Sequence, residues 1–275
     1  MEPVSLVVLL VMGTLAGAIN AAVGSGSLLT LPVLLALGIP PGVAVRTNTI
    51  GILFSTFGSV YGYRREIAEE KAHLGPLTVT AALGATAGAL LLMVSPSQAL
   101  DVAVPVLIVV ALAMVVFQKR LTAALRALRE RRAERRRSAQ RPGADGEDAG
   151  STSPYRSPGL VSSLGLASVY GGYFTAAQGV LYLGILGTFT GRTMGSVNSV
   201  KNLLSLVVNL AAALVYLIAH ITLGVEILWT AVAAIAVGAL VGGYFGAHLA
   251  KRMPEWLLRG VIVVVALFAL ARQVL

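Results

Sequence analysis

The feature that most restricts the fold of this chain is a long apolar run that glycines, serines and a proline interrupt between residues 18 and 38. Inside a lipid bilayer, every backbone N–H or C=O group that lacks a hydrogen bond is costly. Irregular backbone at membrane depth is therefore tolerated only where protein or a watered cavity surrounds it. The interruption predicts a buried break in a membrane helix, and such a break is a candidate binding site.

Composition supports a membrane protein. Of the 275 residues, 56% are hydrophobic and only 12% are charged, which is typical of a polytopic membrane protein and not of a soluble domain. The chain contains no cysteine, so disulfides, thiolate metal sites and a cysteine nucleophile are excluded.

The interrupted stretch has a second copy between residues 170 and 187. Three landmarks recur in the same order and at nearly constant separation: Gly26 with Gly179, residues 46–49 with 198–201, and residues 95–100 with 253–258. This agreement predicts an internal duplication, which many secondary transporters carry.

The lengths of the apolar segments predict the fold. A bilayer core needs roughly 20 apolar residues per helix, and segments of that length lie at about 4–23, 45–63, 74–94, 99–118, 159–177, 195–219, 226–250 and 256–273. The segments 28–37 and 180–189 reach only half-way across the core. We therefore predict an all-α membrane protein with two five-segment repeats, at 1–118 and 159–275. Each has four long transmembrane helices and one short broken or re-entrant segment, and a basic cytoplasmic linker, 119–158, joins the repeats.

The charges of the loops predict the topology. Eleven basic and five acidic residues lie between residues 119 and 157, which marks this linker as cytoplasmic. Five crossings per repeat then place the cationic loops at 64–71 and 251–259 inside and the cation-free loops at 95–101 and 220–225 outside. The repeats should be inverted, with both termini outside. The linker's charge indicates contact with anionic lipid of the bilayer, and no nucleic-acid partner is expected.

Two basic residues, Arg46 and Lys201, could lie at membrane depth, and no Asp or Glu accompanies them. A cation without a carboxylate is costly in a membrane and indicates function, here a small anionic substrate. Each follows a break, near a helix N-terminus that favours anions. Alternatively, Lys201 reaches an interface and Arg46 lies at the outer surface; Arg192 is interpreted as a helix-edge anchor.

Donor groups around these cations complete the predicted site. The substrate-binding candidates are Gly24, Ser25, Gly26, Ser27, Arg46, Thr47, Asn48, Thr49, Gln178, Gly179, Asn198, Ser199, Lys201 and Asn202. The three histidines lack metal-ligand spacing, and no nucleotide-binding motif is present. Neither a metal nor a cofactor is expected. No catalytic residues are assigned, because paired carboxylates and a nucleophile with a base are lacking.

Several of these motifs resemble those of the TauE/SafE sulfite exporter family of bacterial and archaeal membrane permeases. They are Gly24-Ser-Gly-Ser27 with Pro32 and Gly38, Ala44 to Asn48, Tyr170-Gly-Gly172, Gln178-Gly179 and Ser199-Val-Lys201. The resemblance covers nearly the whole chain outside the linker. It implies a multi-pass protein of the bacterial inner membrane that exports a small sulfur oxyanion, most simply sulfite.

Alternatives stay open at this point. The anion could instead be an organosulfonate or thiosulfate, and a membrane-embedded enzyme or a scaffold is the alternative from another class. The chain also departs from the family, which often has a basic residue where Thr49 stands. Arg46 lies three residues earlier, on roughly the same helix face, and would supply that charge. The sequence does not predict the oligomeric state.

Overall fold

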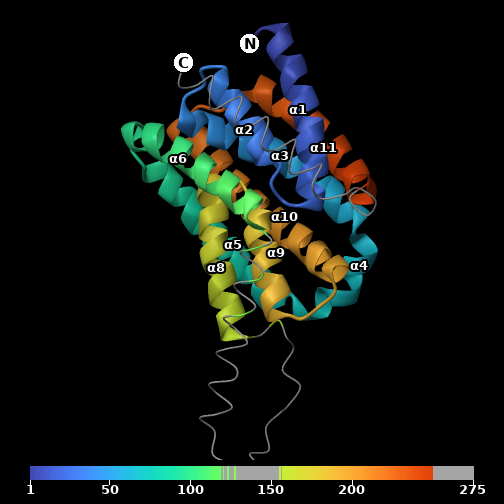
Figure 1. Ribbon diagram of the computed structural model, residues 1–275. Helices are drawn as coiled ribbons and strands as arrows, with labels where there is room; N and C mark the ends of the chain where they lie inside the picture. The colour runs from blue at the N-terminus through green and yellow to red at the C-terminus, as the bar shows by residue number, and fades with distance from the viewer. Residues whose placement is uncertain (119, 121–122, 124–126, 128–154, 156, 250–275) are drawn as a thin grey trace, which may run out of the picture.

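The computed structural model describes residues 1–118, 120, 123, 127, 155 and 157–249, and the regular elements in these ranges are all helical (Figure 1). In chain order they are α1 (Pro3–Ala22), α2 (Ser27–Ala36), α3 (Pro41–Gly62), α4 (Arg64–Glu70), the 3-10 helix η1 (Lys71–His73), α5 (Gly75–Val94), α6 (Ser97–Val116), α8 (Pro158–Phe174), α9 (Gln178–Phe189), α10 (Met194–Leu223) and α11 (Trp229–Leu249). Most of the predicted linker, and the predicted span 256–273, lie outside the described residues.

The all-helical fold class is confirmed, as are the two short segments, α2 and α9. Among the described residues, α1, α5, α6, α10 and α11 are long and apolar enough to cross a membrane, judged by length and composition. Two further predicted spans do not meet both conditions. Helix α3 has 22 residues but includes the polar segment 46–49, and α8 has 17 residues because it ends at the second break.

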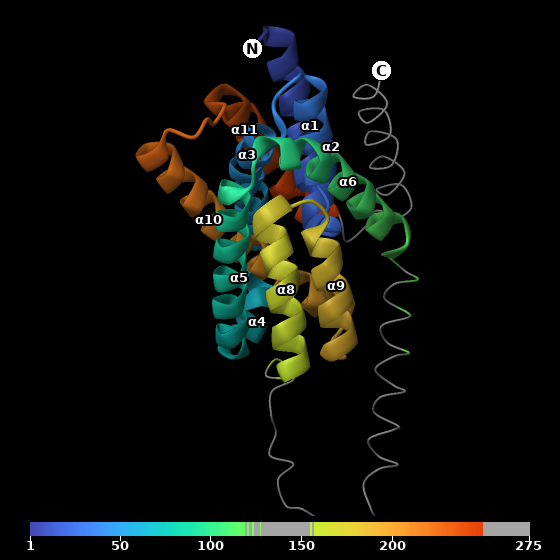
Figure 2. The ribbon, with the colours of Figure 1, turned by 90° about the vertical axis from the view of Figure 1, so that its left-hand side faces the viewer.

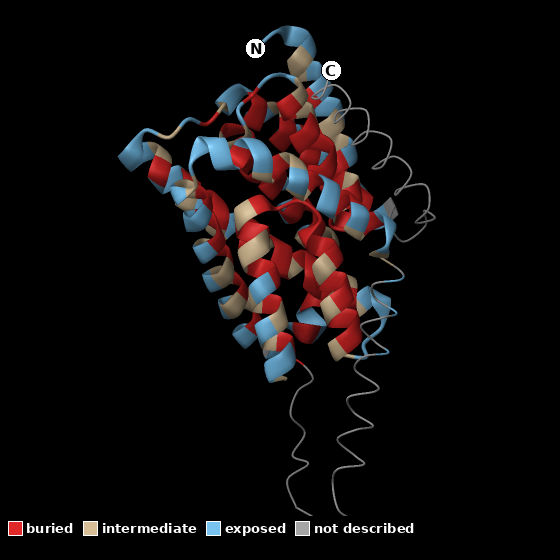
Figure 3. Ribbon diagram, turned by 60° about the vertical axis from the view of Figure 1, so that its left-hand side comes forward, coloured by how far each residue is buried: buried red, intermediate tan, exposed pale blue. Residues whose placement is uncertain are grey.

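The two breaks bring four helices together as two hairpins. Helices α1 and α2 form one hairpin, α8 and α9 form the other, and the hairpins approach from opposite ends of the molecule so that their turns meet in the middle (Figures 1 and 2). The connection between α8 and α9 is buried (Figure 3). This arrangement is what membrane physics requires of irregular backbone, because each turn is covered by protein.

Small residues allow the long helices to pack closely. Helix α11 packs along α1 and α3, and α5 packs along α8 and α10. A Cβ atom on Gly242 would lie 1.9 Å from the Thr14 carbonyl oxygen, and one on Gly88 would lie 2.0 Å from that of Val169. Such backbone approach at small residues is typical of membrane helix interfaces. The first helix of each hairpin thus packs against a helix from the other half of the chain.

The outer surface of the helices is apolar. Large side chains such as Leu83 and Leu166 are 68% and 74% exposed, and many others on α1, α5, α6, α10 and α11 are exposed too. A soluble protein rarely leaves so much apolar surface in contact with water. The surface is therefore suited to lipid, in agreement with the lengths of the helices.

Candidate functional site

The two hairpin turns touch through a pair of glycines. The Gly179 N–H donates to the Gly24 carbonyl oxygen at 3.0 Å. A Cβ atom on either glycine would lie 2.4 Å from the Cα atom of the other, which no real side chain can do. We call this pair the tip contact. It leaves no room for an ion between the two glycines, so a ligand must bind beside them.

The backbone of both turns is unusual. Gly24 has φ of +79°, a left-handed conformation that glycine adopts without steric cost. In the second turn Thr175 and Ala177 have φ of +66° and +57°. For residues with a side chain this conformation is uncommon and strained, and such strain often occurs at functional sites. The second turn is thus held in place by its surroundings.

The polar segment of α3 lies against these turns. Thr47, Asn48 and Thr49 are fully buried. The Thr30 hydroxyl of α2 donates to Asn48 Oδ1, and the Thr49 and Thr175 hydroxyls lie 2.9 Å apart. Because Thr175 donates to the Gly171 carbonyl at 3.1 Å, Thr49 donates to Thr175. Helix α3 therefore contacts the first hairpin through one side chain and the second through the next.

The polar segment of α10 binds the end of α1. Lys201 is fully buried, and its ammonium donates to the carbonyl oxygens of Asn20 at 2.9 Å and Ala21 at 3.2 Å. The side-chain amides of Asn198 and Asn202 also donate to the Ala21 oxygen, at 3.3 Å and 3.2 Å. The last carbonyls of a helix lack intrahelical partners and lie at the negative end of its dipole. We call this group of contacts the α1 cap.

Several predicted site residues keep buried polar atoms without a partner in the described part of the chain. They are Ser25 Oγ, Asn48 Nδ2, Gln178 Nε2, Asn198 Oδ1 and Asn202 Oδ1. Buried polar groups in native proteins nearly always have a partner, so each of these atoms needs an explanation. Three of them can donate a hydrogen bond, and they belong to residues in or against the two turns. This combination suits a ligand that accepts hydrogen bonds.

The other candidates have ordinary surroundings. Ser27 is buried in the first turn of α2, and Gly26 lies against the Ala16 carbonyl of α1. The Ser199 hydroxyl donates to the Ser196 carbonyl of its own helix. The Thr47 hydroxyl accepts from the Leu228 N–H at 3.2 Å. The contacts of these residues are with the protein itself and do not indicate a ligand.

The structure separates Arg46 from the buried cluster. Its Nε donates to the Glu226 carbonyl oxygen at 3.2 Å, in the segment between α10 and α11 and at an exposed position. Arg46 therefore lies at the protein surface beside this segment, and the alternative that it faces the outside of the membrane stays a prediction. Arg46 and Lys201 therefore do not form one site in this conformation.

A second polar contact was missed by sequence reasoning. Glu70 of α4 is buried, accepts from the Ser196 hydroxyl at 2.7 Å and lies 3.5 Å from the half-exposed Arg192 guanidinium. Tyr155 is buried nearby, and burial raises the pKa of its phenol. The sequence placed Glu70 in a loop and Arg192 at a helix edge, and no pattern in it paired them. Through these two contacts, Glu70 joins the first half of the chain to Arg192 and to the start of α10.

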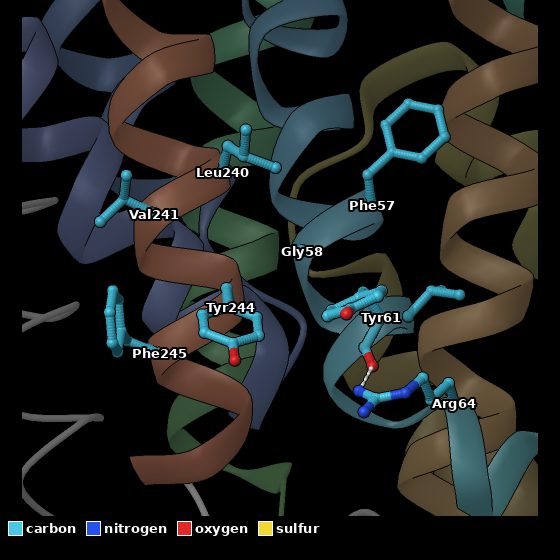
Figure 4. Close-up of a pocket in the computed structure, with 9 residues that line it drawn as sticks. Phe57, Gly58, Tyr61, Arg64, Leu240, Val241, Tyr244 and Phe245 are labelled. Atoms are coloured by element: carbon cyan, nitrogen blue, oxygen red, sulfur yellow. Dashed lines mark hydrogen bonds between the residues drawn. The ribbon is translucent and has the colours of Figure 1, made fainter.

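The structure also has an apolar groove of about 680 Å³ between α3 and α11 (Figure 4). Its lining includes Phe57, Tyr61, Tyr244 and Phe245, and Arg64 lies at one end with its guanidinium over the Tyr61 ring. None of the predicted site residues lines this groove. Its apolar lining does not suit a small anion, so we place the candidate site at the turns.

Comparison with known proteins agrees with this description. A family model described as "Sulfite exporter TauE/SafE" matches residues 9–272. "Probable membrane transporter protein YfcA" of Escherichia coli (strain K12) is 25% identical over 269 residues, which cover 96% of this chain and 88% of that protein. A "Probable membrane transporter protein" of Haemophilus influenzae is 24% identical over 274 residues, covering 98% and 94%.

A third relative matches a shorter part of the chain. "Probable membrane transporter protein ORF9" of Sinorhizobium sp is 32% identical over 101 residues, which cover 37% of this chain and 39% of that protein. No solved structure matches the chain.

Proposed function

We propose that this protein exports a small sulfur oxyanion and that its substrate is sulfite. The premise is that the chain belongs to the sulfite exporter TauE/SafE family and is a membrane transporter. The family description names sulfite, whereas the names of the relatives state only membrane transport. The choice of sulfite therefore follows the family description, and the residues at the turns support an anion as the class of substrate.

The single observation that carries the proposal is the buried Lys201 ammonium beside the first turn. Two of its three N–H groups bind carbonyl oxygens of α1, and no carboxylate among the described residues forms an ion pair with it. A buried cation without a counter-charge is strongly unfavourable unless a partner neutralises it. A transported anion would supply that partner.

The unpaired donors point to the same class of ligand. Ser25 Oγ, Asn48 Nδ2 and Gln178 Nε2 are buried without acceptors among the described residues. Leaving a buried donor unpaired costs about 1–3 kcal/mol. An oxyanion offers several strong acceptors in a small volume, and hydrogen bonds to an ion are stronger than those to a neutral group. Binding of an oxyanion would therefore give several unpaired buried donors an acceptor at the same time.

Other anions are the second candidates. An organosulfonate or thiosulfate would use the same donors, and sulfite is preferred because the family description names it. A membrane-embedded enzyme or a scaffold is the alternative from another class. Purified protein that moves sulfite across a liposome membrane would exclude both, and competition by thiosulfate and small sulfonates would rank the anions.

The architecture we propose is two inverted repeats, at 1–118 and 159–275, joined by the cytoplasmic linker 119–158. The approach of the two hairpins from opposite ends supports this architecture. It is also supported by the packing of the first helix of each hairpin on a helix from the other half of the chain, α1 on α11 and α8 on α5. In the proposed topology, the Arg46 contact with Glu226 closes the outer side. The Glu70 contact with Ser196 and Arg192 closes the inner side. Alternating access would open these contacts one at a time.

We expect the transport to be electrogenic and uncoupled. Proton-driven transporters usually carry a titratable Asp, Glu or His at membrane depth; the sequence offers no Asp or Glu there, and His248 is a weak candidate. A membrane potential negative inside favours anion exit by about 2.3 kcal/mol per charge per 100 mV. In proteoliposomes, a clamped potential should drive sulfite flux without a proton or sodium gradient. Flux that requires either gradient and ignores the potential would contradict this mechanism.

The topology can be tested with single cysteines, because the chain has none of its own. We expect Gln98→Cys to react with an impermeant thiol reagent from outside and Glu255→Cys only from inside. Labelling of both from the same side would contradict the inverted arrangement. The same topology would place the basic linker against anionic lipid of the cytoplasmic leaflet.

A further inference from the structure

We propose that the Lys201 ammonium occupies a cation site built from backbone oxygens, and that removal of the side chain opens this site to a small monovalent metal cation. The lysine would then act as a tethered cation. Its positive charge stays at the end of α1, where a transporter without it would need a free ion.

The first observation is the set of oxygen atoms around the ammonium. The carbonyl oxygens of Asn20 and Ala21 lie 2.9 Å and 3.2 Å from Lys201 Nζ, in the last turn of α1 before the break. Alkali and alkaline-earth cations bind such carbonyl oxygens. In secondary transporters, unwound backbone carbonyls and the C-terminal ends of half-helices coordinate the coupling Na⁺. The α1 cap has this geometry, with an ammonium as the cation.

The second observation comes from the neighbouring amides. Asn202 is 1% exposed, its Nδ2 donates to the Ala21 oxygen, and its Oδ1 has no partner among the described residues. Asn198 is only half-buried, and its Nδ2 donates to the Tyr63 hydroxyl at 2.8 Å as well as to the Ala21 oxygen at 3.3 Å, but its Oδ1 also has no partner among the described residues. Each amide therefore keeps an unused acceptor oxygen on a side chain whose nitrogen already contacts the Ala21 carbonyl. Once the ammonium is removed, reorientation of either amide would offer its oxygen to a metal cation as a ligand in addition to the two carbonyl oxygens.

The electrostatics favour a cation at this position whatever its source. The dipole of α1 places partial negative charge on these carbonyls, and its terminal oxygens have no intrahelical donors. A tethered ammonium satisfies them at every external ion concentration. The wild-type protein should consequently show no requirement for sodium or potassium, which agrees with uncoupled transport.

The test measures thermal unfolding of purified protein in sodium, potassium or N-methylglucamine chloride at equal ionic strength. Lys201→Ala and Lys201→Ser remove the ammonium and leave space beside the oxygens. Lys201→Met is the matched control, because its side chain is uncharged and fills that space. The melting readout needs no transport, so the result does not depend on whether sulfite is the substrate.

We expect sodium or potassium to raise the melting midpoint of Lys201→Ala or Lys201→Ser by roughly 5–10 °C at a hundredfold excess over the Kd. For the wild type and Lys201→Met, the melting midpoint in sodium or potassium chloride should equal the midpoint in N-methylglucamine chloride. If neither small variant responds to a metal cation, the proposal is wrong. It is equally wrong if neither variant folds in sodium or potassium, or if Lys201→Met responds as strongly.

Discussion

Replacing Gly179 with alanine is expected to destabilise the protein and reduce sulfite flux at least tenfold. In the middle of a helix this substitution is normally favourable by up to about 1 kcal/mol. Here the added Cβ atom would lie 2.4 Å from the Gly24 Cα atom, so the backbones of the two turns must separate. Overpacking of this kind costs typically about 1–3 kcal/mol. The melting midpoint and the flux per folded protein measure the two effects.

Gly195→Ala is the matched control for this prediction. Gly195 lies in the first turn of α10, and a Cβ atom there meets its nearest atom, the Thr193 hydroxyl oxygen, at 4.0 Å. This variant should be as stable as the wild type or slightly more stable. Equal behaviour of Gly179→Ala and Gly195→Ala would show that the tip contact does not exist.

Replacing Lys201 with methionine is expected to remove most of the anion flux while the protein still folds. The substitution keeps the volume of the side chain but removes its charge, so the proposed anion loses its buried partner and the Asn20 oxygen loses a donor. Lys201→Arg should retain only part of the flux, because a planar guanidinium does not match a site shaped for a compact ammonium. Voltage-driven flux in proteoliposomes measures both.

Lys71→Met is the control for the loss of a positive charge. Lys71 is exposed in η1, outside the buried cluster. This variant should transport at the wild-type rate. Full transport by Lys201→Met would exclude Lys201 from the site, whatever its effect on stability.

The breaks and the short helices could be predicted from the sequence because their signals are local. Glycine, proline and small hydroxyl residues in an apolar run interrupt the helix at their own positions. The short helices that result, α2 and α9, were confirmed. The second turn was harder, because Thr175 and Ala177 adopt positive φ without a glycine. Only the contacts of the folded protein impose that conformation.

The partners of the polar residues could not be predicted, because they depend on packing between distant helices. The sequence indicated that Lys201 is buried near a break, but the carbonyl oxygens of Asn20 and Ala21 that it binds have no residue-specific signal. The partners of Arg46 and Glu70 could not be predicted for the same reason. Their partners are separated from them by more than a hundred residues and lie on other helices.

The tip contact also restricts how the sequence can change during evolution. Each glycine supplies the empty space that the backbone of the other requires, so a mutation that adds a side chain at Gly24 or at Gly179 meets the same obstacle. Neither position can accept a larger residue unless the opposite turn has moved first. Two codons in different halves of the gene are therefore under a single selective constraint.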